Sequence, residues 1–307
     1  MLVKDIKNIL EQNSKNLSCE FKRLFHGRGN IYKNWEFLTI DSIDDILNVA
    51  FYKQCDEDIE KELLDMLKKF ILNSGHNTIV LQRRYIPKTI AKVIVGELKD
   101  DLFVVENGIK LKLNLLSNQN SGYFPDMKKG RAFIKDISKD KKVLNLFSYT
   151  CGFSLSAISG GALSVTNIDM AKGALTTGRE NHHLNNFDTY NVKFYPHNIL
   201  KSFSKIKREA PYDIIIIDPP TFQKGSFETT KDYDKIIKRL EVIASPNCVV
   251  LACLNSPNLN ESFIINLFKE YASNFEFIER LSNLEEFKSL DENRSLKNLV
   301  FQKGTYL

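Results

Sequence analysis

The residues best suited to chemistry follow a strongly apolar run in the last third of the chain. In YDIIIIDPPTFQKGS (212–226), four isoleucines are followed directly by an acid, two prolines and an aromatic ring. The prolines fix φ and remove two N–H donors, so the turn offers carbonyl acceptors beside a carboxylate, while the ring offers a stacking surface. We predict that this turn holds a planar substrate, through Asp218, Pro219, Pro220 and Phe222. A plain strand end followed by a turn is the simpler alternative.

Two further segments carry residues suited to ligand binding. The run VLNLF is followed by SYTCGFS, in which small and hydroxyl-bearing residues and a glycine open a helix, so that backbone N–H groups can approach a polar ligand. The predicted contacts are Ser148, Tyr149, Thr150 and Gly152, although any tight strand-to-helix turn also favours a glycine. Asp169 ends the next strand and is placed to accept both hydroxyls of a ribose.

These two segments alone would also fit a nicotinamide-dependent oxidoreductase. The GxGxxG spacing that brings the backbone close to a pyrophosphate is absent, because only Gly152 falls in the tight part of the turn. A ligand without phosphates, such as S-adenosylmethionine, does not require a loop with several closely approaching glycines. A carboxylate, hydroxyls and amides can hold its amino-acid end. The turn at Asp218 therefore favours a methyl donor.

The elements that position these residues follow a regular alternation after Asp140. Five strand-like runs, each separated by a helical stretch, predict an α/β fold with a mostly parallel sheet, and two closing runs predict a last strand that is antiparallel. Upstream, Asn107-Gly108 between two alternating runs predicts a two-residue hairpin. We expect a small α+β domain over 1–77, a β-rich connector over 78–120 and the parallel sheet over 121–307.

Composition limits the remaining possibilities. A net charge of +5 permits an anionic partner without demanding one. Five cysteines without a CxxC pair predict neither a disulfide framework nor a metal site. No apolar run approaches the roughly 20 residues of a membrane helix. We therefore expect a soluble protein of the reducing cytoplasm, with no membrane partner.

The motifs, taken in order, resemble a known family. NGIKLKLNLLSNQNSGYFPDMKKGR, VLNLFSYTCGFSLSA, NIDMAKGAL, DPPTFQKGSF and LACLNSPNL are similar to those of class I S-adenosylmethionine-dependent methyltransferases. More narrowly, they resemble the bacterial large-subunit ribosomal RNA methyltransferases that modify carbon 5 of cytosine or nitrogen 7 of guanine. The resemblance covers about 79–307. It implies a Rossmann-like seven-stranded sheet, S-adenosylmethionine as cofactor and a base of RNA, most simply ribosomal RNA, as substrate.

The resemblance also implies roles for individual residues. Phe124, Asp126 and Arg131 match a pattern that lines the cofactor side, Asp218 serves both cofactor and substrate, and Cys151 stands where the family usually has a loop glycine. Asn198 takes the place of an aspartate that meets the adenine amino group, a hydrogen bond that its carbonyl can also accept.

The atom that is methylated decides whether a cysteine is needed. Reaction at carbon 5 of cytosine requires a thiolate that first attacks carbon 6, and Cys253 is the candidate, whereas a ring nitrogen needs only alignment. Cys253 has an alternative interpretation as a buried apolar residue, and the cytosine-directed relatives carry more serine and cysteine here. We therefore favour a ring nitrogen. His182 and His183 are interpreted as surface residues.

Two basic segments are candidates for RNA contacts. In KRLFHGRGNIY (22–32), Lys22, Arg23 and Arg28 lie beside Phe25 and Tyr32, which suits a phosphate backbone and a stacked base, although a solvated loop explains the composition equally well. The candidates for phosphates around the base are Lys128, Lys129, Arg131 and Lys224. A catalytically silent RNA-binding relative stays open as an alternative.

Overall fold

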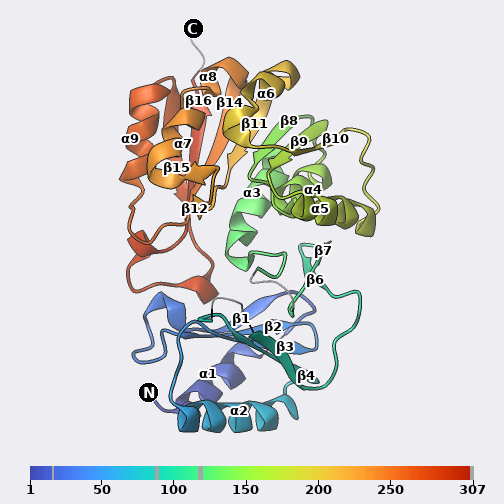
Figure 1. Ribbon diagram of the computed structural model, residues 1–307, viewed down its shortest axis with the longest axis vertical. Coiled ribbons are helices and arrows are strands. Elements are labelled where there is room, and N and C mark those ends of the chain that lie inside the picture. The colour runs from blue at the N-terminus through green and yellow to red at the C-terminus, as the bar shows by residue number, and fades with distance from the viewer. Residues whose placement is uncertain (16, 87–89, 117–119, 305–307) are drawn as a thin grey trace. The chain divides into compact units, whose positions relative to one another are not determined.

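The computed structural model describes residues 1–15, 17–86, 90–116 and 120–304. The chain forms two compact units (Figure 1). Unit 1 comprises Met1–Pro125 and Leu284–Asp291, and unit 2 comprises Asp126–Asn283 and Glu292–Leu307. Within the described residues, no helix combines the length and the apolar character needed to cross a bilayer.

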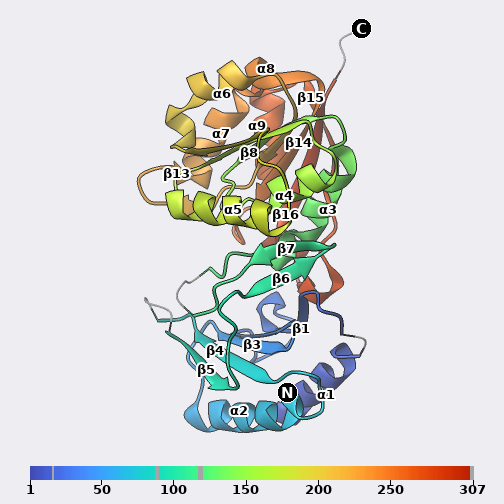
Figure 2. The ribbon, with the colours of Figure 1, turned by 90° about the vertical axis from the view of Figure 1, so that its right-hand side faces the viewer.

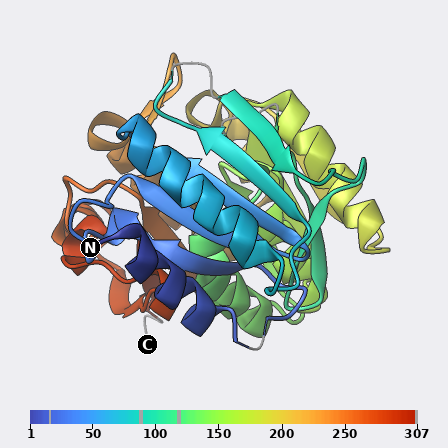
Figure 3. The same cartoon turned by 90° about the horizontal axis from the view of Figure 1, so that it is seen from below.

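Unit 1 contains a five-stranded sheet with the order β1-β2-β3-β4-β5, in which only β3 and β4 pair in parallel. Helices α1 and α2 lie side by side on one face of this sheet (Figure 3), and their apolar stripes form one core with it. Asp56 caps α2 by accepting hydrogen bonds from the amides of Asp58 and Ile59. The bounds are α1 (Val3–Asn13), β1 (Lys22–His26), β2 (Leu38–Ile43), β3 (Ile46–Phe51), α2 (Glu57–Ile71), β4 (Thr78–Arg83) and β5 (Ile90–Val95).

The sheet of unit 1 continues across position 77, where the sequence analysis places a boundary. Residue pairs such as Ile46 and Thr78 join β3 to β4, so the first part of the expected connector belongs to the same sheet as β1–β3. The second part is a separate hairpin of β6 (Phe103–Glu106) and β7 (Ile109–Lys112). Asn107 and Gly108 both have positive φ, 49° and 80°, which confirms the two-residue hairpin.

A short segment from the far end of the chain also packs in unit 1. The 3-10 helix η4 (Glu285–Phe287) places the Phe287 ring against Phe21 and beneath the Arg23 guanidinium, 4.5 Å from the ring centroid. The amide of Leu290 donates to the carbonyl of Gly29. This return was not predicted, because one aromatic residue in a polar loop carries no sequence signal of its distant partner.

Two residues proposed for RNA contacts are instead part of the core of unit 1. Arg23 is buried and pairs with Asp41, with 2.5 Å between Nε and Oδ1, and Phe25 is buried and stacks on Tyr32. The interpretation of these two side chains as ligand contacts was wrong, because the three middle residues of β1 are all buried and these two side chains contact interior partners. Arg28 is exposed.

Unit 2 has a seven-stranded sheet with the order β10-β9-β8-β11-β14-β16-β15. All neighbours are parallel except β16, which runs antiparallel to β14 and β15, as predicted. The strands are β8 (Lys142–Leu146), β9 (Ser164–Asp169), β10 (Val192–Pro196), β11 (Tyr212–Ile217), β14 (Ala244–Leu254), β15 (Phe275–Leu281) and β16 (Lys297–Lys303).

Helices cover both faces of this sheet (Figure 2), and a small hairpin follows β11. The hairpin consists of β12 (Phe222–Gln223) and β13 (Phe227–Glu228). The helices are α3 (Lys128–Ile137), α4 (Gly152–Ser159), α5 (Lys172–Leu184), α6 (Phe203–Glu209), α7 (Thr229–Ile237), α8 (Leu240–Ile243) and α9 (Ser262–Tyr271).

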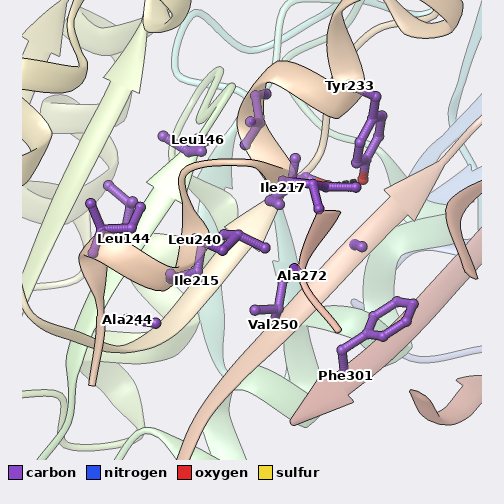
Figure 4. Close-up of a cluster of buried hydrophobic side chains, with 14 of the residues drawn as sticks. Leu144, Leu146, Ile215, Ile217, Tyr233, Leu240, Ala244, Val250, Ala272 and Phe301 are labelled. Atoms are coloured by element: carbon purple, nitrogen blue, oxygen red, sulfur yellow. Dashed lines mark hydrogen bonds between the residues drawn. The ribbon is translucent and has the colours of Figure 1, made fainter. Parts of the chain in front are cut away.

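The four isoleucines of β11 serve both faces of the sheet. Ile215 and Ile217 join a core built with α6–α9, part of which is drawn in Figure 4, whereas Ile214 and Ile216 join a second core with α3 and α4. A strand that is buried on both faces has no polar positions, so the apolar run reflects its central place in the sheet. Burial of each such side chain stabilises the fold by about 1.5–3 kcal/mol.

Candidate active site

The order of strands reverses between β8 and β11, which are neighbours in the sheet although β9 and β10 lie between them in the chain. In an open α/β sheet, ligands bind outside the carboxyl ends of the strands at this point. The segments that leave these ends are 147–152 after β8, 169–171 after β9, 197–198 after β10 and 218–222 after β11. They contain most of the residues that the sequence analysis selected in unit 2.

The loop after β8 has an unusual backbone. Phe147, Tyr149 and Cys151 have positive φ angles of 59°, 47° and 64°. Each non-glycine residue in this conformation costs about 1–2 kcal/mol, and such residues cluster at ligand sites. Three of the loop amides are already bonded within the protein: those of Ser148, Tyr149 and Cys151 donate to the Ile168 carbonyl (3.2 Å), the Asp169 carboxylate (2.9 Å) and the Ser148 carbonyl (2.7 Å).

Asp169 fixes this loop from the end of β9. Its carboxylate accepts hydrogen bonds from the amides of Tyr149 (2.9 Å) and Ala171 (2.8 Å) and is buried. Burial raises the pKa of this carboxyl, and the two amide hydrogen bonds oppose that rise. Each oxygen uses one lone pair on these amides, so both keep acceptor capacity for the ribose hydroxyls that the sequence analysis assigns to them.

A narrow crevice lies between the loops that follow β8, β9 and β10. Its walls combine apolar side chains with amide and hydroxyl groups, and its volume of about 10 Å³ is close to that needed for one water molecule. Asn198 lies here and caps the 3-10 helix η3 (Ile199–Lys201), with its Oδ1 3.2 Å from the Lys201 amide. Its predicted contact with an adenine amino group stays a prediction. The crevice is lined by Phe147, Met170, Asn198, Ile199, Leu200, Gln223 and Ser226.

Asp218, after β11, is half-buried and electrostatically coupled to two residues near α3. Burial and, to a smaller extent, the negative charge of Asp126 raise its pKa to about 7, and the positive charge of Arg131 opposes this rise. Unit 2 therefore brings together three of the charged residues predicted for the cofactor. Phe124 belongs to unit 1, where its side chain is exposed.

The turn after Asp218 is held by hydrogen bonds and presents its ring outward. The Thr221 hydroxyl donates to the Asn255 carbonyl (3.0 Å), and the Thr229 hydroxyl approaches the Pro220 carbonyl (3.4 Å), while Pro219 is buried. Phe222 opens β12 and is 64% exposed. The turn is thus held in place by hydrogen bonds and presents an exposed aromatic ring.

The hairpin that carries Phe222 is anchored beside the cofactor loop. Phe227 of β13 is buried and packs edge-on against Phe147, with 4.8 Å between ring centroids, and it also contacts Tyr233 of α7. The hairpin of β12 and β13 and the loop after β8 therefore share one aromatic cluster.

Cys253 lies within β14 and is buried. Burial raises the pKa of its thiol well above the ordinary value, and the charges of Asp218 and Asp126 raise it further. Its carbonyl accepts a hydrogen bond from the Tyr233 hydroxyl (3.1 Å). The surroundings thus favour the neutral thiol.

Of the four cations proposed to contact phosphates around the base, only Lys224 is exposed. Arg131 is buried, and Lys128 and Lys129 are partly covered. The ammonium group of Lys129 donates to the Ser282 hydroxyl (2.7 Å) and the Asn283 carbonyl (3.0 Å).

The interpretation of His182 as a surface residue was wrong, whereas His183 is exposed. His182 is fully buried in α5, where Nδ1 lies 2.7 Å from the Gly178 carbonyl and Nε2 lies 3.0 Å from the Ser154 hydroxyl. Because a carbonyl only accepts, the proton resides on Nδ1 and Nε2 accepts from Ser154. The three-to-four-residue spacing of Leu175, Gly178 and His182 is the helical signal that marks this buried face.

The hydrogen-bond network of His182 extends to side chains of the neighbouring helix and strands. The Asn167 side chain donates to the Ser154 hydroxyl (3.0 Å), and the Asn145 side chain donates to Asn167 (2.9 Å). These buried bonds connect β8, β9, α4 and α5, the four elements that carry the loop. Asn181 adds a hydrogen bond to the Thr150 carbonyl (3.0 Å).

The residues present fit S-adenosylmethionine. The Ser148 hydroxyl is buried and, apart from the neighbouring Cys151 thiol, has no hydrogen-bond partner in the described part of the chain, so it is available to a polar ligand. Asp169 supplies acceptor oxygens, and the Ser148 hydroxyl supplies a donor. A search of the described residues finds no group of histidine, cysteine and acidic side chains that could hold a metal ion.

Fold and site together define a class I S-adenosylmethionine-dependent methyltransferase. The family model for S-adenosylmethionine-dependent methyltransferases matches residues 22–302, and the chain belongs to this family. The family match leaves no support for the nicotinamide alternative, and the cofactor is S-adenosylmethionine.

The curated relatives include proteins named for action on ribosomal RNA. The Bacillus subtilis protein YwbD, named provisionally as a ribosomal RNA large subunit methyltransferase, is 30% identical over 92% of this chain and 74% of its own length. Ribosomal RNA large subunit methyltransferase I of Aeromonas salmonicida is 30% identical over 61% of this chain, which spans about half of that protein (49%).

Solved structures show the same fold. A Streptococcus mutans protein described as an S-adenosylmethionine-dependent methyltransferase is 25% identical and superposes with a TM-score of 0.87 over 98% of this chain and 82% of its own. SMU.776, described as a methyltransferase complexed with SAH, superposes equally well at 24% identity, with the same coverage of both chains.

Proposed function

We propose that this protein transfers a methyl group from S-adenosylmethionine to a base of RNA, and that its substrate is large-subunit ribosomal RNA. The names of the curated relatives support this substrate. The observation that carries the proposal is the Phe222 ring, 64% exposed on a fixed turn directly after Asp218. An exposed aromatic residue beside a methyl-donor site is suited to stack on a base.

The residues of the chain act mainly by alignment. When bound, S-adenosylmethionine supplies an electrophilic methyl group on a sulfonium, a good leaving group. Asp169 and the loop of 147–152 hold the cofactor, while the Asp218 turn holds the base edge and Phe222 its face. Such positioning, with exclusion of water, accounts for most of the rate gain in displacements of this kind.

The base must leave its stack to reach this site, since the deep and narrow major groove of an RNA helix does not admit an enzyme's active site. The substrate is accordingly a loop, a bulge or an incompletely assembled RNA. Work on ribosomal RNA would place the protein in the cytoplasm.

We propose reaction at a ring nitrogen and a structural role for Cys253. Reaction at carbon 5 of cytosine needs a thiolate, and the pKa of this buried thiol is raised well above its ordinary value. Substitution of Cys253 by alanine should leave methyl transfer within a few-fold of wild type. A loss of several orders of magnitude, with cofactor binding retained, would instead support covalent catalysis.

The test of the proposed function is methyl transfer by Phe222→Ala. We expect transfer to RNA to fall at least tenfold while binding of S-adenosylmethionine, measured by calorimetry, stays unchanged, because base stacking is worth about 1–3 kcal/mol. Tyr190→Ala is the control, since Tyr190 is 89% exposed and precedes β10, at the opposite end of the parallel strands from the turn that carries Phe222. Equal activity of Phe222→Ala and wild type on RNA would refute the stacking role.

A further inference from the structure

Two arginines of unit 1 converge on one tyrosine ring. The guanidinium carbon of Arg28 lies 4.2 Å from the centroid of the Tyr52 ring, and that of Arg84 lies 5.6 Å from the same centroid. Arg84 also donates from Nη1 to the Tyr52 hydroxyl (3.2 Å) and from Nε to the Gln82 side chain (3.0 Å). We call Arg28, Tyr52 and Arg84 the arginine–tyrosine cluster.

The cluster stands on rigid backbone. Tyr52 follows β3 and Arg84 follows the parallel neighbour β4, and both continue the sheet hydrogen bonding, through Tyr52 N–H to the Phe37 carbonyl (2.7 Å) and Arg84 N–H to the Phe51 carbonyl (2.8 Å). Arg28 lies in the 3-10 helix η1 (Gly27–Gly29), whose first glycine packs so tightly on the Trp35 carbonyl that no side chain would fit. Three separate segments thus hold the two cations in place.

The charge of the cluster is not balanced within the described chain. Neither Arg28 nor Arg84 has an acidic partner there, whereas the adjacent Arg83 pairs with Glu60 and Arg23 pairs with Asp41. Both guanidinium groups approach one ring, so their separation does not exceed the Debye length of about 10 Å at 0.1 M salt, and salt does not fully screen their repulsion. Two unpaired like charges held together on a fixed frame indicate a site for an anion.

We propose that the arginine–tyrosine cluster binds a phosphodiester group of the RNA substrate backbone. This proposal rests on the proposed function, because it identifies RNA as the source of the phosphate. Guanidinium groups are suited to phosphate, since their planar fork makes paired, charge-assisted hydrogen bonds. The Tyr52 ring adds no negative charge that would compete with the phosphate, and it keeps the arginine side chains in position through cation–π contact. Phe25 and Arg23, the neighbouring candidates for RNA contacts from the sequence, are buried in the core of unit 1.

The test compares Arg28→Gln, Arg84→Gln and the double variant with wild type. Binding of a large-subunit ribosomal RNA fragment is measured by fluorescence anisotropy at several salt concentrations. Each lost phosphate contact should make the slope of log affinity against log salt shallower by about 0.7–0.9. The Michaelis constant for RNA should rise, while kcat and calorimetric binding of S-adenosylmethionine stay unchanged. Lys69→Gln is the control, because this cation is exposed on α2 of the same unit.

Two substitutions of Tyr52 separate the positioning of the arginines from an effect on folding. Tyr52→Phe keeps the ring and loses only the hydroxyl bonded to Arg84, so it should retain most of the RNA affinity. Tyr52→Leu removes the ring and should weaken RNA binding while cofactor binding remains. Equal RNA affinity for Tyr52→Leu and wild type would contradict the role of the ring.

The outcomes distinguish this proposal from the proposed function. If wild type binds and methylates RNA and the arginine variants show an unchanged salt slope, the phosphate site is wrong and the function stands. If wild type binds S-adenosylmethionine but no RNA, the RNA substrate itself is wrong, and the cluster with it. Inorganic phosphate, titrated alone, tests the other source of this chemistry: tight binding that the arginine variants lose, without an effect on RNA affinity, would assign the cluster to a small phosphate.

Discussion

At the residue scale, Asp169 connects the cofactor loop to the end of β9 through two backbone amides. Asp169→Ala leaves both amides without their acceptor and removes the acceptor for the ribose. Hydrogen bonds to a charged group contribute about 1.5–3 kcal/mol, so affinity for S-adenosylmethionine should fall at least tenfold. Calorimetry measures this, with Asp136→Ala, an exposed acid of α3, as the control. An unchanged affinity for S-adenosylmethionine would show that Asp169 does not bind the cofactor.

Asp218 should make stability depend on pH. Its pKa is raised from 3.8 to about 7 in the folded protein, so the folded state holds a proton that the unfolded state releases. This proton contributes stability that is fully present below 3.8 and is lost as pH rises through 7. Asp218→Asn removes this contribution, so its melting temperature should fall less than that of wild type between these values. Parallel curves for the two proteins would contradict the raised pKa.

At this scale the sequence predicted which residue types stand at the strand ends, but it did not predict which side chains contact one another. The sequence analysis placed Asp169 and the turn of Asp218 at strand ends, where the structure has them, and their roles toward a ligand stay predictions. Arg23 and Phe25 were misassigned since charge and aromaticity alone do not distinguish a ligand contact from a buried pair. The arginine–tyrosine cluster joins residues 28, 52 and 84, so only the sheet register brings it together.

At the element scale, the cofactor loop and α5 are coupled through Cys151 and Gly178. A Cβ added to Gly178 would lie 2.5 Å from the Cys151 sulfur, which is fully buried. Gly178→Ala should therefore destabilise the fold by about 1–3 kcal/mol through overpacking and weaken cofactor binding. Denaturant unfolding measures the first effect and calorimetry the second.

The matched test of this coupling is the double variant with Cys151→Gly. Glycine removes the sulfur and accepts the positive φ of 64° without strain. The double variant should recover most of the stability that Gly178→Ala loses, giving a clear coupling energy in a double-mutant cycle. Additive effects of the two substitutions would show that the contact does not constrain the loop.

The alternation of strands and helices predicted the parallel sheet, its antiparallel strand and the hairpin at Asn107. Periodicity and turn residues are local signals, so elements of this kind are accessible from sequence. The backbone strain at Phe147 and Tyr149 could not be predicted from the sequence, because neither residue type favours positive φ by itself. Surrounding structure imposes that conformation.

At the scale of the whole molecule, unit 1 includes residues on both sides of position 77 and a return from 284–291. A chain that begins at residue 78 would lack β3, the parallel partner of β4, and would expose Ile79 and Leu81 of the core. We expect this shortened chain to aggregate or to melt without cooperativity, as measured by circular dichroism and size-exclusion chromatography. A soluble, cooperative product would place the boundary at 77 after all.

The central claim is that this methyltransferase acts on an RNA base. The most direct measurement is transfer of a labelled methyl group from S-adenosylmethionine to large-subunit ribosomal RNA that lacks its modifications, followed by mass mapping of the modified nucleotide. The account predicts label in one RNA base, lost with Asp169→Ala and strongly reduced with Phe222→Ala. Binding of S-adenosylmethionine without any label in RNA would contradict the account and favour a catalytically silent relative.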